Sequence, residues 1–260
     1  MGNERMKKCL AAMAAASLLL CGTVAGGVLV GGCKNGRFGS SLSKSDQVRI
    51  GQQASRDVER QSKIITKGPQ YEQLERVAAK IMPLAQKDFD VPYTVKLIDN
   101  KEINAFSLPG GPIYFYKGLM DMTTSDDEVA SVLGHEATHI VKQHAAQQIS
   151  DAQAKNIVAQ IAFGRAGQLA QTFAGLALQI QQLKYSRDDE SQADEFGFKY
   201  LVEAGYDPDS MATMFQKLKA KSGDGGPEWL QNHPLSDRRI QAAQQRAEAY
   251  KKAQQGHRTP

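Results

Sequence analysis

Three of the five histidines in this 260-residue chain fall within ten residues, in the stretch VLGHEATHIVKQHA that begins at Val132. On a helix, His135 and His139 would lie about 40° apart on one face and about 6 Å apart along the axis, within reach of one ion. Glu136 would project roughly 100° away from His135, where a base could take a proton from a water molecule beside the ion. The spacing predicts a metal site with Glu136 as catalytic base. The alternative is a helix whose polar face happens to be rich in histidine.

A third metal ligand is needed, because catalytic zinc sites normally have three protein ligands and one open position. His144 lies five residues after His139, about 140° away around a helix, so we expect it to miss the ion. The pattern HExxHxxGxxH, which supplies a third histidine after a glycine, is absent because Lys142 and Ala145 occupy the required positions. The third ligand is therefore expected to be a carboxylate from another helix.

The segment YSRDDESQADEFG, which begins at residue 185, offers that carboxylate. One helical stripe of this segment combines two acids with two very small residues, namely Glu190, Ala193, Asp194 and Gly197. The small residues would let the two helices approach closely enough for Glu190 to bind zinc at about 2.0 Å. Asp194, one turn on, could accept the other ring N–H of a ligating histidine. The alternative is an ordinary charged helix face on which a neighbouring acid would serve equally.

The elements that position these residues follow from sequence patterns. Residues 46–67 and 69–87 are predicted to be helices, the second opening with Pro69 at a favourable first position. Segments starting at residues 93, 103 and 112 are rich in β-branched and aromatic residues and predict a small sheet. Ser125 and Glu128 form a capping box, so the histidine helix should start near Asp126. The remainder is predicted to be helical, with the Gln/Ala-rich residues 143–182 as long amphipathic helices or a helical hairpin. The predicted fold class is α+β, mainly helical, with a small β-sheet beside the histidine helix.

Composition limits the partners of the chain. The formal net charge is +4, and the charged residues before residue 9 contribute +2 of it, so the remainder is too balanced to indicate nucleic acid. All three cysteines lie in the first 33 residues, so the rest of the chain has neither a disulfide framework nor a cysteine metal site. The sequence does not indicate whether the chain forms oligomers.

The first 32 residues have the layout of a secretory signal peptide, with a positive start and a run of 22 weakly apolar residues from Cys9 to Val30. Val-Gly-Gly-Cys at residues 30–33 resembles the lipobox of bacterial lipoproteins, which implies lipid attachment at Cys33. The alternative is an uncleaved transmembrane anchor, because such a run can just span a bilayer. Residues 33–45 read as a flexible Gly/Ser-rich tether before a domain at 46–255. Lys34 is not an acidic residue of the kind associated with retention in the inner membrane, which favours the outer membrane.

Five segments, spread in order over roughly residues 50–245, resemble the M48 family of HExxH zinc metallopeptidases (gluzincins), especially their soluble periplasmic lipoprotein members. They are Asn-Ala-Phe at 104–106, GHEATHIVKQHA from Gly134, YSRDDESQADEFG from Tyr185, AGYDP from Ala204 and HPLSDRR from His233. One departure is that no window after residue 33 approaches the 18 uninterrupted apolar residues of a membrane helix.

The resemblance implies a zincin-like metallopeptidase domain that uses one Zn²⁺ per chain. It implies that the zinc ligands are His135, His139 and Glu190 and that the catalytic base is Glu136. It also implies that Asp194 is the partner of a ligating histidine and that His233 and Arg239 line the cleft.

Three roles are open for His233. With Arg239, it could stabilise the negative charge that develops on the scissile carbonyl oxygen. It could instead belong to a His-Pro turn that caps the last helix. Because it follows the Gly-rich stretch SGDGGPEWLQN, it could also occupy the open position of the metal and hold the enzyme off.

The expected substrate is an unfolded or extended polypeptide. The stretch SLPGGPIYFY from residue 107 reads as an edge strand, because prolines are tolerated where an outward N–H is not needed. A peptide could add there as one more strand, with modest sequence selectivity. Substrate contacts are therefore expected at Asn104, Ala105, Phe106, Gly110 and Gly111, although Asn104 could equally satisfy its own backbone beside a turn.

The sequence thus predicts a zinc endopeptidase that cleaves misfolded or envelope proteins in the bacterial periplasm while anchored to a membrane through lipid on Cys33. The alternative is a periplasmic assembly factor that binds unfolded outer-membrane proteins and has latent protease activity. A structural protein with an accidental HEATH sequence is a third reading.

Overall fold

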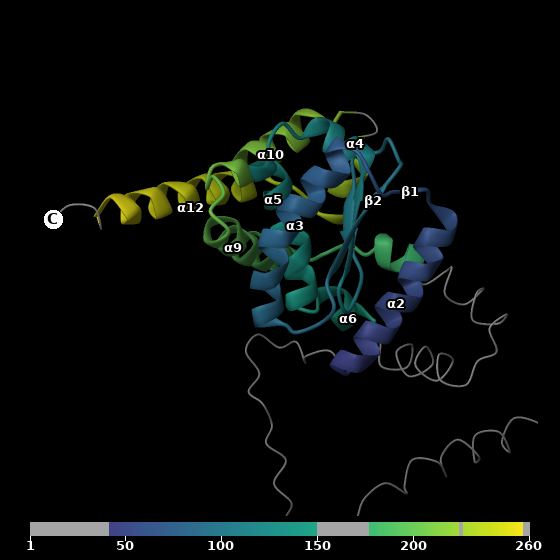
Figure 1. The fold of residues 1–260 in the computed structure, drawn as a ribbon. Coiled ribbons are helices and arrows are strands. Elements are labelled where there is room, and N and C mark those ends of the chain that lie inside the picture. The colour runs from purple at the N-terminus through teal and green to yellow at the C-terminus, as the bar shows by residue number, and fades with distance from the viewer. Residues whose placement is uncertain (1–41, 150–176, 224–225, 257–260) are drawn as a thin grey trace, which may run out of the picture. The chain divides into compact units, whose positions relative to one another are not determined.

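The structure is a computed structural model that describes residues 42–149, 177–223 and 226–256 (Figure 1). The predicted signal peptide, the lipidation site at Cys33 and most of the predicted tether lie outside the described residues. Residues 150–176 of the Gln/Ala-rich stretch also lie outside them, so the predicted hairpin stays a prediction.

The described chain is mainly helical with one small sheet, as the sequence predicts. Its helices are α2 (Lys44–Gln61), α3 (Pro69–Asp88), α4 (Lys117–Met122), α5 (Asp126–Val141), α6 (His144–Gln148), α9 (Arg187–Glu203), α10 (Ser210–Ala220), α11 (Glu228–Asn232) and α12 (Asp237–Gly256). Its strands are β1 (Ile64–Ile65), β2 (Thr94–Ile98), β3 (Ala105–Ser107) and β4 (Pro112–Tyr116).

The four strands form one mixed sheet in the order β1-β2-β4-β3. β2 and β4 run parallel, with Thr94 opposite Pro112, whereas the two outer pairings are antiparallel. Strand β3 joins β4 through a tight connection in which Leu108 N donates to Pro112 O at 2.8 Å.

Alternation along β4 divides the core into two layers. Ile113 and Phe115 face the larger layer, which contains apolar residues of α3, α5, α9, α10 and α12. Tyr114 and Tyr116 face the smaller layer, which contains residues of α2 and α6. Figure 1 accordingly shows α2 on one side of the sheet and α3 with α5 on the other. The histidine helix α5 is therefore enclosed by the larger core.

Two sequence predictions need correction. The first helix runs from Lys44 only to Gln61, and residues 64–65 form β1, which pairs with Leu97 and Ile98 of β2. The stretch from residue 112 is not an edge strand, because β4 lies between β2 and β3. Pro112 is tolerated there as the first residue of the strand. The outer strand on this side is β3.

Within the described ranges, no helix is both long enough and apolar enough to cross a membrane.

Candidate metal centre

The start of α5 is set by local hydrogen bonds. Ser125 Oγ accepts from Glu128 N at 3.3 Å, as predicted. The Glu128 carboxylate, however, accepts from Thr124 N at 2.8 Å and pairs with Lys217 Nζ at 2.6 Å. The predicted capping box is therefore only half formed, since Glu128 bonds to the residue before the cap and to a lysine of α10.

Helix α9 brings its acids beside α5. Its start has a reciprocal capping box, in which Ser186 Oγ accepts from Asp189 N at 3.2 Å and Asp189 Oδ2 accepts from Ser186 N at 3.0 Å. A Cβ atom at Gly197 would lie 2.9 Å from His135 N, and one at Gly134 would lie 2.8 Å from Gly197 O. Since real side chains do not tolerate such distances, the two glycines allow the close helix packing that the sequence predicts.

Four side chains converge where α5 and α9 meet. His135 Nε2 and His139 Nε2 lie 3.1 Å apart, and each is 3.6 Å from a carboxylate oxygen of Glu190. His233 Nδ1 lies 3.1 Å from His135 Nε2 and 2.9 Å from Glu190 Oε1. One atom from each residue falls within 4.8 Å of all the others. The structure thus brings together the three predicted ligands and adds His233.

The chemistry of this cluster fits a divalent metal ion. All four side chains are at most 2% exposed. Burial lowers the pKa of His135, and it lowers those of His139 and His233 well below the usual value, so the imidazoles are neutral, as metal ligands must be. Burial also raises the pKa of Glu190 to about 7. Two imidazole nitrogens facing each other and a costly buried carboxylate are both accounted for by a shared cation, and this nitrogen and oxygen donor set is typical of zinc.

Asp194 and Arg239 fix the orientation of two of these side chains. Asp194 Oδ1 lies 3.1 Å from His135 Nδ1, the contact that the sequence predicts for it. Arg239 donates to both oxygens of Asp194, at 2.7 and 2.8 Å, and its Nη1 lies 2.5 Å from Glu190 Oε2. Although burial acts to raise it, hydrogen bonds from His135 and Arg239 lower the pKa of Asp194. Arg239 therefore holds Glu190 of the cluster directly and His135 indirectly through Asp194.

His144 supports His139 in a way that helical spacing does not predict. It is absent from the four-residue cluster, as expected, but its Nδ1 lies 2.9 Å from Nδ1 of His139, and it is 2% exposed. The helix ends at Val141, and Gln143 has a left-handed backbone with φ 58° and ψ 30°. We call residues 142–144 the Gln143 turn. The turn folds the chain back, so His144 meets the ring nitrogen of His139 that faces away from the cluster.

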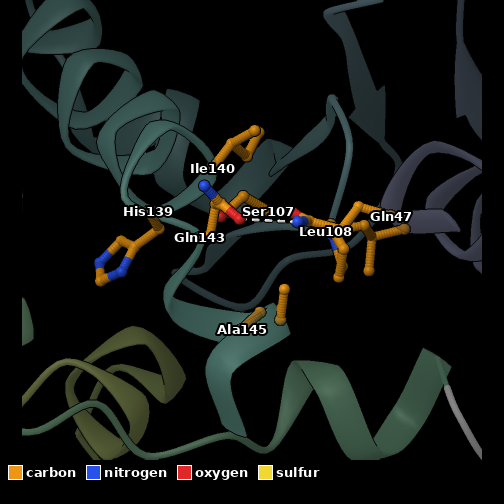
Figure 2. A pocket seen from close by; sticks show the side chains of 9 residues that line it. Gln47, Ser107, Leu108, His139, Ile140, Gln143 and Ala145 are labelled. Atoms are coloured by element: carbon orange, nitrogen blue, oxygen red, sulfur yellow. Dashed lines mark hydrogen bonds between the residues drawn. The ribbon is translucent and has the colours of Figure 1, made fainter. Parts of the chain in front are cut away.

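The Gln143 turn is tied to the first helix of the described chain. Gln47 Nε2 donates to Gln143 Oε1 at 2.7 Å across 96 residues of sequence, the dashed contact in Figure 2. The same view shows both glutamines and His139 around a small hollow that Ser107 and Leu108 also line. Helix α2 thus braces the turn that carries His144.

Glu136 is fully buried beside the cluster. Its Oε1 accepts from Trp229 Nε1 at 3.0 Å, whereas its Oε2 has no hydrogen-bond partner among the described residues. Burial raises its pKa to about 8, against hydrogen bonds from Trp229 and Ser107 that act to lower it. One oxygen is therefore held in place and the other is free to exchange a proton.

His233 follows helix α11 and reaches the cluster by stacking. Its ring lies 4.6 Å from that of Trp229 with an interplanar angle of 14°, and its N donates to Trp229 O at 2.9 Å. The start of α12 is capped by Ser236, whose O and Oγ both accept from Arg239 N. The capping role considered for His233 is therefore filled by another residue.

The predicted substrate-contact residues are all buried in the described chain. Ala105 and Phe106 lie on the outer strand β3, where Phe106 stacks on Tyr114 with a ring-centroid distance of 5.1 Å. Asn104 is 2% exposed, and its O accepts from Tyr116 N at 3.0 Å.

Gly110 and Gly111 form the β3–β4 connection. Both have positive φ, and their Cβ positions are blocked by the backbones of Val48 and Pro92.

Comparison with known proteins assigns the family. Residues 69–247 match the family model described as Peptidase family M48, which is more than half of the chain. The chain therefore belongs to peptidase family M48, a family of metallopeptidases.

The chain is similar to several known proteins. It is 29% identical over 225 residues to the putative beta-barrel assembly-enhancing protease of Vibrio cholerae, covering 82% of this chain and 46% of that protein. It is 27% identical over 221 residues to the beta-barrel assembly-enhancing protease of Escherichia coli K12, covering 80% and 45%. Metalloprotease LoiP of E. coli K12 is 30% identical over 213 residues, covering 80% and 83%. The chain thus spans less than half of the first two proteins and most of the third.

Proposed function

We propose that this protein is a zinc-dependent endopeptidase that hydrolyses unfolded or extended polypeptides in the bacterial cell envelope. The observation that carries the proposal is the convergence of two histidines of α5 and one carboxylate of α9 within 3.6 Å of each other, with Glu136 alongside. Membership of peptidase family M48 supports the same reaction class.

One zinc ion would be held by His135 Nε2, His139 Nε2 and the Glu190 carboxylate. When bound there, zinc supplies a Lewis acid that polarises a carbonyl group and lowers the pKa of water. Asp194 would accept the Nδ1–H of His135 and so keep its Nε2 directed at the ion. We expect one equivalent of zinc in the purified protein, measurable by atomic emission.

Glu136 is the group we assign to proton transfer. Its unpartnered Oε2 would take the proton of the attacking water and return it to the leaving amine, while the bond from Trp229 keeps the carboxylate in position. Arg239 is occupied by Asp194 and Glu190, so we assign it a positioning role instead of direct charge stabilisation.

His233 is proposed to hold the site closed. Its Nδ1 lies 3.1 Å from His135 Nε2 and 2.9 Å from Glu190 Oε1, so it would compete with a water or a substrate carbonyl for the ion. The cluster is at most 2% exposed, and we infer that the segment carrying His233 moves aside when a polypeptide binds. His233→Ala should therefore raise the rate of casein cleavage, and an unchanged or lower rate would contradict this role.

The decisive experiment compares digestion of casein and of an unfolded porin by the wild type and Glu136→Gln, with and without a chelator. The wild type should cleave both substrates, and either the substitution or the chelator should abolish cleavage. A Glu136→Gln protein that binds zinc and cleaves normally would refute the mechanism.

The second candidate is an assembly factor for outer-membrane proteins with latent protease activity. The position of His233 in the cluster favours latency, and two relatives are named as beta-barrel assembly-enhancing proteases. In cells that lack the native protein, a Glu136→Gln copy that restores envelope function with intact zinc would favour this candidate over the endopeptidase.

The envelope location rests on the N-terminal sequence. We propose a signal peptide at residues 1–32, lipid attachment at Cys33 and a tether through residue 45 to the metallopeptidase domain at 46–255, with the outer membrane favoured. Labelled fatty acid should appear in the wild type and not in Cys33→Ser. Membrane fractionation would then identify which membrane holds the protein.

A further inference from the structure

A recess of about 730 Å³ lies beside Glu190, between α9, the start of α12 and the segment 234–236. We call it the arginine hollow. Its charged lining contains four arginines, Arg187, Arg238, Arg239 and Arg246. Glu190 and Asp194 line the side nearest the histidine cluster.

The acids of the hollow already have cationic partners. Arg239 pairs with both Glu190 and Asp194. Asp237, the third acid of the lining, pairs with Lys219. The carboxylates that line the recess are therefore satisfied without the remaining three arginines.

Those three arginines have no such partners. Among the described residues, no ion pair or hydrogen bond involves the side chain of Arg187, Arg238 or Arg246. Arg246 is only partly exposed, and its Nη1 is buried without a hydrogen-bond partner in the same part of the chain. A buried guanidinium N–H without an acceptor costs free energy. Together with the exposed Arg187 and Arg238, Arg246 leaves the hollow with positive charge that no carboxylate of its lining balances.

We propose that the arginine hollow is a subsite for the carboxylate of an Asp or Glu side chain of the peptide substrate. This inference rests on the proposed function, because Glu190 marks where the scissile bond would lie. A substrate residue close to that bond would reach the hollow. The planar guanidinium matches a carboxylate in two-point contact, and Arg246 lines the recess together with Arg187 and Arg238.

The test uses quenched fluorescent peptides of one sequence that carry either Glu or Gln at the positions flanking the cleavable bond. For the full-length wild type with zinc, kcat/KM should be about tenfold higher for the Glu peptide, the effect expected of one charge-assisted hydrogen bond. In Arg187→Gln/Arg246→Gln this ratio should fall to about 1, mainly through KM of the Glu peptide. Arg246→Glu should instead cleave a third peptide, with Lys at the same positions, faster than the Glu peptide.

Arg56→Gln is the matched control, since Arg56 is exposed on α2, on the far side of the sheet from α9 (Figure 1). It should keep the tenfold ratio. The subsite is refuted if the wild type does not distinguish the peptides, or if the double variant keeps the preference. A second outcome would also overturn the subsite in favour of a membrane contact. In that outcome the wild type binds anionic phosphatidylglycerol vesicles and the double variant does not, while the peptide selectivity is the same in both.

A binding measurement separates this inference from the peptidase assignment. Fluorescence anisotropy with Glu136→Gln reports peptide affinity without cleavage. If the wild type cleaves neither peptide, the proposed function fails. The subsite would still be supported if the Glu peptide binds more tightly than the Gln peptide and this difference disappears in the arginine variants. Equal affinity for the two peptides would overturn the subsite.

Discussion

Replacing His144 with alanine should weaken zinc binding about 10- to 100-fold, although His144 is not one of the proposed ligands. If His139 binds zinc through Nε2, its Nδ1 must carry the hydrogen and donate it. The acceptor at 2.9 Å is Nδ1 of His144, and both rings are at most 2% exposed. Removing it would leave a buried N–H unpaired, at a cost of about 1–3 kcal/mol.

This cost falls mainly on the metal-bound protein. Without zinc, His139 can shift its hydrogen to Nε2, which faces His135 Nε2 at 3.1 Å. With zinc, that alternative tautomer is excluded, because Nε2 would bind the ion. A loss of about 1.4–2.8 kcal/mol in binding corresponds to the 10- to 100-fold range.

The assay is competition for Zn²⁺ with a chromophoric chelator, together with the visible spectrum of the Co²⁺-substituted protein. Gln148→Ala, an exposed change on the same short helix, is the control and should keep wild-type affinity. The melting temperatures of the metal-free proteins test whether the variant is folded. Zinc affinity within twofold of wild type in a folded His144→Ala protein would refute the reasoning and leave His144 a packing residue.

Three further changes test the supporting structure. Gly197→Ala should destabilise the protein by about 1–3 kcal/mol in urea unfolding, because the new Cβ would lie 2.9 Å from His135 N; a variant as stable as wild type would contradict the close packing of α5 and α9. Gln47→Ala should cost about 0.5–1.5 kcal/mol and lower zinc affinity less than His144→Ala does, since it removes the bonds to Gln143 and Leu42 but no group that touches His139; an effect larger than that of His144→Ala would argue against the proposed brace. Chelation should lower the melting temperature, because it removes about 2.7 kcal/mol of stabilisation when free zinc was present at 100 times its dissociation constant. An unchanged melting temperature would argue against a metal bound to the folded state.

Short-range signals account for what the sequence predicts well. The start of α5 depends on the hydroxyl of Ser125, and the start of α3 depends on Pro69, both within one turn of the boundary. The stripe containing Glu190 and Gly197 follows from the helical repeat, and the structure buries it against α5. Such features require no knowledge of the rest of the chain.

Non-local contacts account for most of what was missed. Residues 64–65 pair with Leu97 and Ile98, and two isoleucines are too short a run to predict a strand alone. The central place of β4 depends on which strands flank it, which its own residues do not specify. The sequence left three roles open for His233, and the contact that distinguishes them is also non-local, because its ring stacks on Trp229 and lies 3.1 Å from His135 across 98 residues of sequence.

His144 shows why an ideal helix is a poor guide beside a helix end. The prediction that it misses the ion assumed 100° per residue through residue 144, but helical geometry stops at Val141. A single left-handed residue, Gln143, then redirects the chain, and glutamine has no special preference for that conformation. Gln47, on another helix, donates a hydrogen bond to its side chain and braces the turn. The turn that places His144 behind His139 thus includes a contact made across 96 residues of sequence, which no local pattern predicts.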